Sequence, residues 1–134
     1  MKTIDISTAD RTQFVDITRQ IQRVVSESNM TDGAVVVCSA HTTAGITINE
    51  NADPDVVSDS LAVLDRLAPV QGSYAHREGN SDAHVKTSLV GLSVIVPVEH
   101  GRLVLGTWQG IHFCEFDGPR RRQVMVQLLA AWQG

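Results

Sequence analysis

The spacing of apolar positions changes from one element to the next along the first part of the chain. Residues 2–7 alternate polar and apolar side chains, as a half-buried strand does. From Phe14 to Val25 the apolar residues recur at steps of three and four, which predicts an amphipathic helix over about residues 18–28. The turn-forming residues 29–33 then end that helix.

Two strands and a second helix are predicted next. Residues 34–40 read as a β-branched, buried strand, and residues 45–49 resemble a shorter one. Asp53-Pro54 begins the helix, because the carboxylate can cap the first turn and proline fits the first helical position. The helix is expected to end at Leu67, before a proline.

A polar loop covers residues 70–81, which are rich in Gly, Ser and Asn. A loop of this length in a small domain is more often functional than decorative. A short helix is expected over about residues 83–89, with Ser81 or Asp82 at its N-terminus.

The last third of the chain is strand-like. It contains four apolar runs, at residues 92–99, 102–107, 110–117 and 123–131. His100-Gly101 lies between the first two and is a plausible hairpin turn. Several runs are apolar at both parities, which predicts strands covered on both faces. We therefore expect an α+β fold, a mainly antiparallel β-sandwich or sheet with two or three helices packed against it.

The composition fits one globular domain spanning residues 1–134, with 43% hydrophobic and 19% charged residues. The apolar runs are far shorter than the roughly 20 residues that span a bilayer, so no membrane segment is expected. No signal peptide is evident, which favours the cytoplasm and makes Cys38 and Cys114 free thiols rather than a disulfide. The net charge of -4 argues against a nucleic-acid partner, and the basic run Arg120-Arg121-Arg122 is too short to change this.

The five histidines carry the strongest chemical signal. His41 lies at the end of a predicted strand, and His76 and His84 bracket the polar loop. Three neutral imidazoles converging there would form an open metal site with a position left for water or substrate. The alternative is three solitary polar residues, since no closely spaced histidine pair decides the question. His100 is interpreted as a turn residue, and His112 as a packed strand residue.

Acidic and anion-binding candidates surround these histidines. Glu50 can act as a general base or orient a ligating imidazole, although on the sequence alone capping of the next helix, together with Asp53, is the favoured account. An anion site is possible where the helix starting near Ala83 points free N–H groups toward the polar loop. The candidate phosphate ligands are Thr42, Thr43, Gly45, Asn80, Ser81, Lys86 and Arg120. No P-loop, GxGxxG or GxSxG motif is present.

Four segments in this order resemble one family. They are residues 41–45 with Asn49-Glu50-Asn51, residues 80–86, residues 106–109 and residues 114–120. Together they resemble the YjbQ-like family, also called secondary thiamine-phosphate synthase enzymes. The resemblance covers about residues 4–129, nearly the whole chain.

The resemblance implies an α+β sandwich that assembles as a homotrimer and holds a metal ion near an acidic residue and an anion pocket. Carried over to this sequence, it makes His41, His76 and His84 the metal ligands. It makes Asn49 and Glu50, together with His84, the candidate catalytic residues. A three-histidine site favours zinc or a similar divalent transition metal.

The activity that the resemblance implies is thiamine phosphate synthesis, in which hydroxymethylpyrimidine diphosphate joins thiazole phosphate and diphosphate leaves. That reaction needs charge stabilisation on the diphosphate and an aligned nitrogen nucleophile. Magnesium, the usual diphosphate partner, prefers oxygen ligands, which leaves the native substrate open. The expectation is a metal-dependent enzyme acting on a phosphorylated small molecule. The alternatives are a metal-dependent hydrolase or lyase with Glu50 as base, and a non-catalytic module that binds a metal or metabolite.

Overall fold

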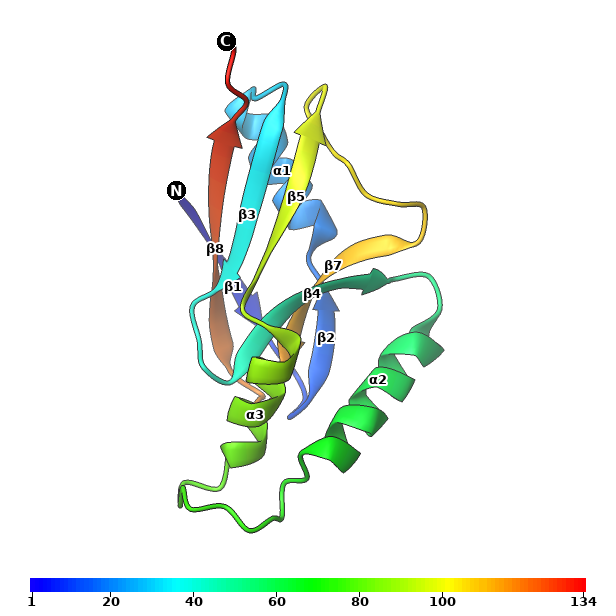
Figure 1. Cartoon of the computed structure of the whole chain (residues 1–134), viewed down its shortest axis with the longest axis vertical. Helices are drawn as coiled ribbons and strands as arrows, with labels where there is room; N and C mark the ends of the chain where they lie inside the picture. Colours follow the sequence, from blue (N-terminus) through cyan, green and yellow to red (C-terminus); the bar gives the residue numbers. More distant parts are fainter.

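The computed structural model describes residues 1–134, which form two antiparallel sheets and three helices (Figure 1). The larger sheet has the strand order β1-β8-β3-β5-β6, and the smaller has the order β2-β7-β4. The strands are β1 (Lys2–Ser7), β2 (Gln13–Asp16), β3 (Gly33–Ser39), β4 (Ala44–Glu50), β5 (Ser93–Glu99), β6 (Arg102–Leu103), β7 (Gln109–Glu115) and β8 (Arg121–Ala130). The helices are α1 (Thr18–Ser28), α2 (Pro54–Leu67) and α3 (Ser81–Val90). The α+β class is confirmed.

Local signals placed several elements correctly. The helix α1 spans the predicted residues, and α2 starts where its capping signal predicts. The Asp53 carboxylate accepts a hydrogen bond from the Asp55 backbone N–H at 2.9 Å, which satisfies one free donor of the first turn. His100 and Gly101 both adopt positive φ, at 51° and 74°, as a tight hairpin turn requires.

Other elements differ from the prediction. The strand expected at residues 102–107 pairs only over Arg102–Leu103, at the edge of the larger sheet. The four-residue strand β2 was not predicted, because it is too short to show a period. The helix α3 begins at Ser81, one of the two residues expected at its N-terminus, but its N-cap residue is Asn80. Ser81 and Asp82 do not cap it, because their side chains bond His76 and the cations Arg11 and Lys86.

The main core lies between the larger sheet and a layer made of α1 and the smaller sheet. Ile21 and Val25 of α1 pack there with Val35 of β3 and Phe113 of β7, all fully buried. The other face of the larger sheet is uncovered in the single chain, where Ile95 is 66% exposed. The expectation that the apolar strands are covered on both faces therefore fails for this sheet.

The helices α2 and α3 lie beside the smaller sheet, on the face turned away from the main core (Figure 1). Cys114 and Phe116 pack there against Ala83 of α3. Burial raises the pKa of the Cys114 thiol, and neither Cys114 nor Cys38 forms a disulfide. None of the three helices combines the length and apolarity that crossing a membrane requires.

Candidate functional site

The loop between β3 and β4 places consecutive residues, His41 and Thr42, in two pockets. The first, here called the His41 pocket, has a volume of about 650 Å³ and no hydrophobic lining residue. Its lining is Asp5, Ser7, His41, Arg121, Arg122 and Gln123. The second, the His84 pocket, has a volume of about 550 Å³. Its lining is Thr42, His84, Thr87, Ser88, Gly91 and Leu92.

His41 is held in one tautomer by the backbone. The Gln123 N–H donates a hydrogen bond to His41 Nε2 at 2.8 Å, so this nitrogen is the unprotonated one and Nδ1 carries the hydrogen. Burial lowers the pKa of His41, and the charges of Arg122 and Arg120 lower it further against an opposing effect of Glu115. The ring is therefore neutral near pH 7, with Nδ1–H left as its donor.

A buried ion pair lies directly behind the pocket. Arg122 donates through Nε to Glu115 Oε1 at 2.8 Å and through Nη2 to the other carboxylate oxygen. The same Nη2 donates to Thr43 Oγ1 at 2.9 Å, which ties the loop to β8. Burial raises the pKa of Glu115, but hydrogen bonds from Arg122, Thr8 and the Asp117 N–H bring it below its ordinary value. Arg122 is thus neutralised in place, and Arg121 is the pocket's free cation.

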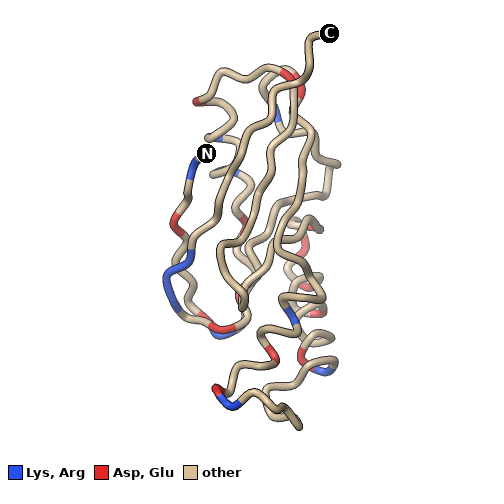
Figure 2. The backbone as a smooth tube through the Cα atoms, turned by 60° about the vertical axis from the view of Figure 1, so that its left-hand side comes forward, with Lys and Arg blue, Asp and Glu red and all other residues tan.

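The basic run that contains these arginines is the longest blue stretch of backbone in Figure 2. Its first member, Arg120, donates to the Asp117 carbonyl oxygen at 2.8 Å and to Asp117 Oδ2 at 3.2 Å. The Arg120 side chain is 51% exposed, so it stays reachable from solvent. Among the expected phosphate ligands near His41, only Arg120 is both charged and exposed to solvent.

The structure brings together two of the three expected metal ligands. The rings of His76 and His84 lie edge to face with centroids 5.4 Å apart. His76 Nδ1 is 3.0 Å from Ser81 Oγ, which orients the ring. His41 does not join them, and no group of three or more His, Cys, Asp or Glu side chains in the chain is placed to hold a metal ion. A single chain therefore supplies two of the three expected histidine ligands, His76 and His84, and lacks the third.

Three expected phosphate ligands have other partners. Lys86 is fully buried, and its Nζ donates to Asp65 at 2.7 Å and to Asp82 at 3.0 Å, so the ammonium is not free for a phosphate. Asn80 donates through Nδ2 to an Asp117 oxygen. At Gly45 a Cβ would lie 2.4 Å from the Gly91 carbonyl oxygen, so its close backbone approach is to the end of α3 rather than to a ligand.

Glu50 and Asn49 lie at the far end of β4 from the histidines. The seven residues of β4 extend about 20 Å, with the His41 loop at one end and Glu50 at the other. Glu50 Oε2 accepts a hydrogen bond from the Asp53 N–H at 3.3 Å, which is the capping role. The chain does not bring Glu50 next to His41.

Comparisons of the sequence and of the structure with known proteins point to the same family. The sequence profile described as "UPF0047 protein YjbQ-like" matches residues 2–131. The chain belongs to this family. UPF0047 protein YugU of Bacillus subtilis is 51% identical over 130 residues, covering 96% of this chain and 98% of its own. UPF0047 protein MJ1081 of Methanocaldococcus jannaschii is 52% identical, covering 92% and 90%. A crystal structure of a YjbQ/UPF0047 family protein from Clostridium acetobutylicum has a TM-score of 0.95 and 53% identity, covering 96% of this chain and all of that one.

Several residues around the two pockets were missed from the sequence. Glu115 is the clearest case, because a carboxylate inside an otherwise apolar strand signals a buried partner. Arg11 gave no such signal: it contacts Asp82 at 3.0 Å and Asp117 at 3.5 Å, both far along the chain. Arg121 was anticipated only as a member of the basic run 120–122, whose guanidinium groups were possible phosphate donors.

Proposed function

We propose that the chain is an enzyme acting on a phosphorylated small molecule, and that the phosphate binds in the His41 pocket. The observation that carries this proposal is the wholly polar lining of that pocket, in which a neutral His41 lies beside Arg121 and Arg122. A guanidinium group matches phosphate geometry, and an Nδ1–H donor adds a further hydrogen bond. The volume suits a small molecule.

The specific reaction proposed is thiamine phosphate synthesis, as the family resemblance implies. In this assignment Arg121 balances part of the charge of the departing diphosphate, and the His41 Nδ1–H donates a hydrogen bond to it. The His84 pocket, on the other side of the same loop, receives part of the organic substrate beside His84 and Thr42. The Glu115–Arg122 pair keeps the loop and β8 in place, so the donors need little reorganisation.

The hydrolase alternative with Glu50 as base has less support. Glu50 caps α2 at the far end of β4, and no cluster of acidic and histidine ligands surrounds it. The binding-module alternative uses the same two pockets and is distinguished by turnover alone.

A divalent transition metal such as zinc stays a proposal, at the His76–His84 pair. The pair supplies two imidazoles, so a further ligand has to come from water, substrate or a second copy. No step of the proposed reaction is assigned to it. Metal content of the purified chain, compared with a His76→Ala/His84→Ala variant and with His100→Asn as control, tests it; equal content in all three contradicts the site.

We also propose that the chain self-associates, as a homotrimer in the cytoplasm. The uncovered face of the larger sheet supports association, since Ile95 and Leu129 are 66% and 48% exposed there. The trimer number comes from the family resemblance.

The test of the function is product formation from hydroxymethylpyrimidine diphosphate and thiazole phosphate. We expect the parent chain to form thiamine phosphate, and folded His84→Ala and His41→Gln variants to lose about 100-fold or more in rate. The His100→Asn variant keeps the left-handed turn and should retain the rate. Undiminished turnover in both folded variants would remove these pockets from the mechanism. Ligands that raise the melting temperature without any turnover would favour the binding module.

A further inference from the structure

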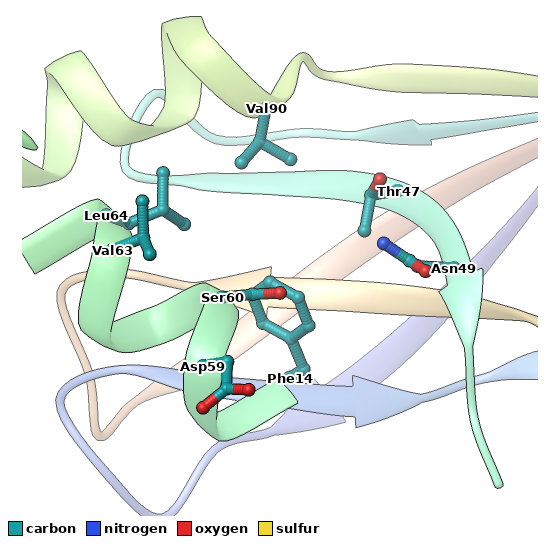
Figure 3. Close-up of a pocket in the computed structure, with 8 residues that line it drawn as sticks. All are labelled: Phe14, Thr47, Asn49, Asp59, Ser60, Val63, Leu64 and Val90. Carbon is teal, nitrogen blue, oxygen red and sulfur yellow. The ribbon is translucent and has the colours of Figure 1, made fainter. Parts of the chain in front are cut away.

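We propose that a third pocket, the groove between α2 and the smaller sheet, binds a small organic amine with an apolar body. The groove has a volume of about 410 Å³, with Thr47 and Asn49 of β4 on one side and Ser60 and Val63 of α2 on the other (Figure 3). It lies on a different face from the His41 pocket, so the proposal stands apart from the proposed function.

A buried histidine without hydrogen-bond partners lies next to this groove, behind the lining residues Thr47 and Phe14. His112 is 3% exposed, and neither of its ring nitrogens has a partner. His112 of β7 lies opposite Thr47 of the neighbouring strand β4, so both side chains point to the same face of the smaller sheet. Its ring centroid is 5.8 Å from that of Phe14, which lines the groove. Two residues that flank His112 thus form the groove wall.

The carboxylate that lies opposite His112 on β2 is not a hydrogen-bond partner of its ring. Asp16 is opposite His112 on β2. Its oxygens accept hydrogen bonds from the Thr18 N–H at 2.9 Å, the Thr18 hydroxyl at 2.6 Å and Asn51 Nδ2 at 3.0 Å. Burial raises the pKa of Asp16, but these hydrogen bonds lower it overall and hold the carboxylate in its charged form. A buried polar group left in this state marks a place where a ligand can complete the bonding.

The lining selects the class of ligand. Phe14, Leu64 and Val90 supply apolar surface for the body of the molecule. Asp59 is the only charged residue that lines the groove, so an anion would meet a carboxylate and no cation. An ammonium group gains from Asp59, and an imidazole nitrogen that carries no hydrogen can accept one of its hydrogens. The groove remains open because α2 has no buried residue that fills it.

Benzylamine is a suitable probe, because it combines an aromatic ring with an ammonium group, and benzoate is a matched anion of similar size. We expect benzylamine to shift the His112 ring signals in the NMR spectrum of the ¹⁵N-histidine-labelled chain, and benzoate to leave them unchanged. Asp59→Asn should weaken benzylamine binding at least tenfold, whereas Glu99→Gln, an exposed carboxylate on β5, should not. His112→Phe fills the same space without a polar group and should abolish binding while keeping the melting temperature.

Three results would overturn the proposal. One is that neither probe moves the His112 signals at millimolar concentration, which would leave water as the only partner of the ring. Another is equal binding of benzylamine and benzoate, or equal binding by the parent chain and Asp59→Asn. The third is a groove occupied by a second copy, shown by a Val63→Lys variant that dissociates an oligomer.

Discussion

At the scale of single residues, the ion pair of Glu115 and Arg122 organises the proposed phosphate site. Both side chains are almost fully buried, and the Glu115 carboxylate accepts four hydrogen bonds, from two Arg122 nitrogens, Thr8 and the Asp117 N–H. A buried charge is tolerated only where its partners are complete. The pair therefore positions the His41 loop and does not itself bind substrate.

Removing half of this pair should be costly. Glu115→Ala leaves Arg122 buried without its counter-ion, and we expect a loss of about 3–5 kcal/mol in the free energy of unfolding. Urea denaturation of the variant and of the exposed control Glu99→Ala measures it. A loss no larger than that of the control would show that the pair is not structural.

The pH dependence of stability tests the state of His41. Its pKa is lowered from 6.5, so between that value and the lowered one the unfolded chain binds more protons than the folded chain. Stability should therefore fall as the pH drops below about 6.5, and His41→Gln should remove that part of the slope. Glu115, with a pKa lowered from 4.5, loses its contribution only below 4.5. Melting temperatures between about pH 7.5 and pH 5 isolate the His41 effect; parallel curves for parent and variant would contradict it.

The sequence predicted which residues lie near the site better than it predicted their hydrogen-bond and ion-pair partners. The position of His41 at a strand end follows from local pattern. Its hydrogen bond with Gln123 joins residues 82 positions apart, which no local signal encodes. Lys86 illustrates the same limit, because its pairing with Asp65 depends on how α3 packs beside the end of α2.

At the scale of elements, the boundaries that carry a local signal, such as those of α1 and α2, were predictable and packing was not. The proline and capping signals placed α2 correctly because they act within one turn. These local signals do not say how the helix packs: none of its side chains is fully buried in the chain, and Leu61 and Leu64 are half-buried. The groove beside α2 exists for this reason.

This difference predicts unequal local stability of two helices. The helix α1 fully buries Ile21 and Val25, while α2 has no fully buried residue and only half-buried ones such as Leu61 and Leu64. Amide hydrogens of α2 should therefore exchange at least tenfold faster than those of α1, because α2 can open without disturbing the core. Hydrogen exchange read by NMR decides it, and equal protection in both helices would contradict the expectation.

At the scale of the whole molecule, the uncovered face of the larger sheet accounts for the proposed self-association. Its strands are apolar at both parities, which predicted cover on both faces, and the single chain covers only one. A second copy can supply the other cover. The sequence carries this requirement, but nothing local in it fixes how many copies assemble.

Analytical ultracentrifugation tests the assembly. We expect a mass three times the 14.6 kDa of the chain. Ile95→Lys, on the uncovered face, should shift the protein toward monomer, whereas Leu67→Lys, an exposed position on α2, should not. A monomeric parent chain at micromolar concentration would contradict the proposal.

Calorimetric titration with inorganic diphosphate tests the proposed phosphate site most directly. We predict one diphosphate bound per chain, with affinity reduced at least tenfold by His41→Gln and by Arg121→Ala. Arg102→Ala, an exposed arginine on β6, should leave the affinity unchanged. Equal affinity in all four proteins, or no binding by the parent chain at millimolar diphosphate, would contradict a phosphate site in the His41 pocket.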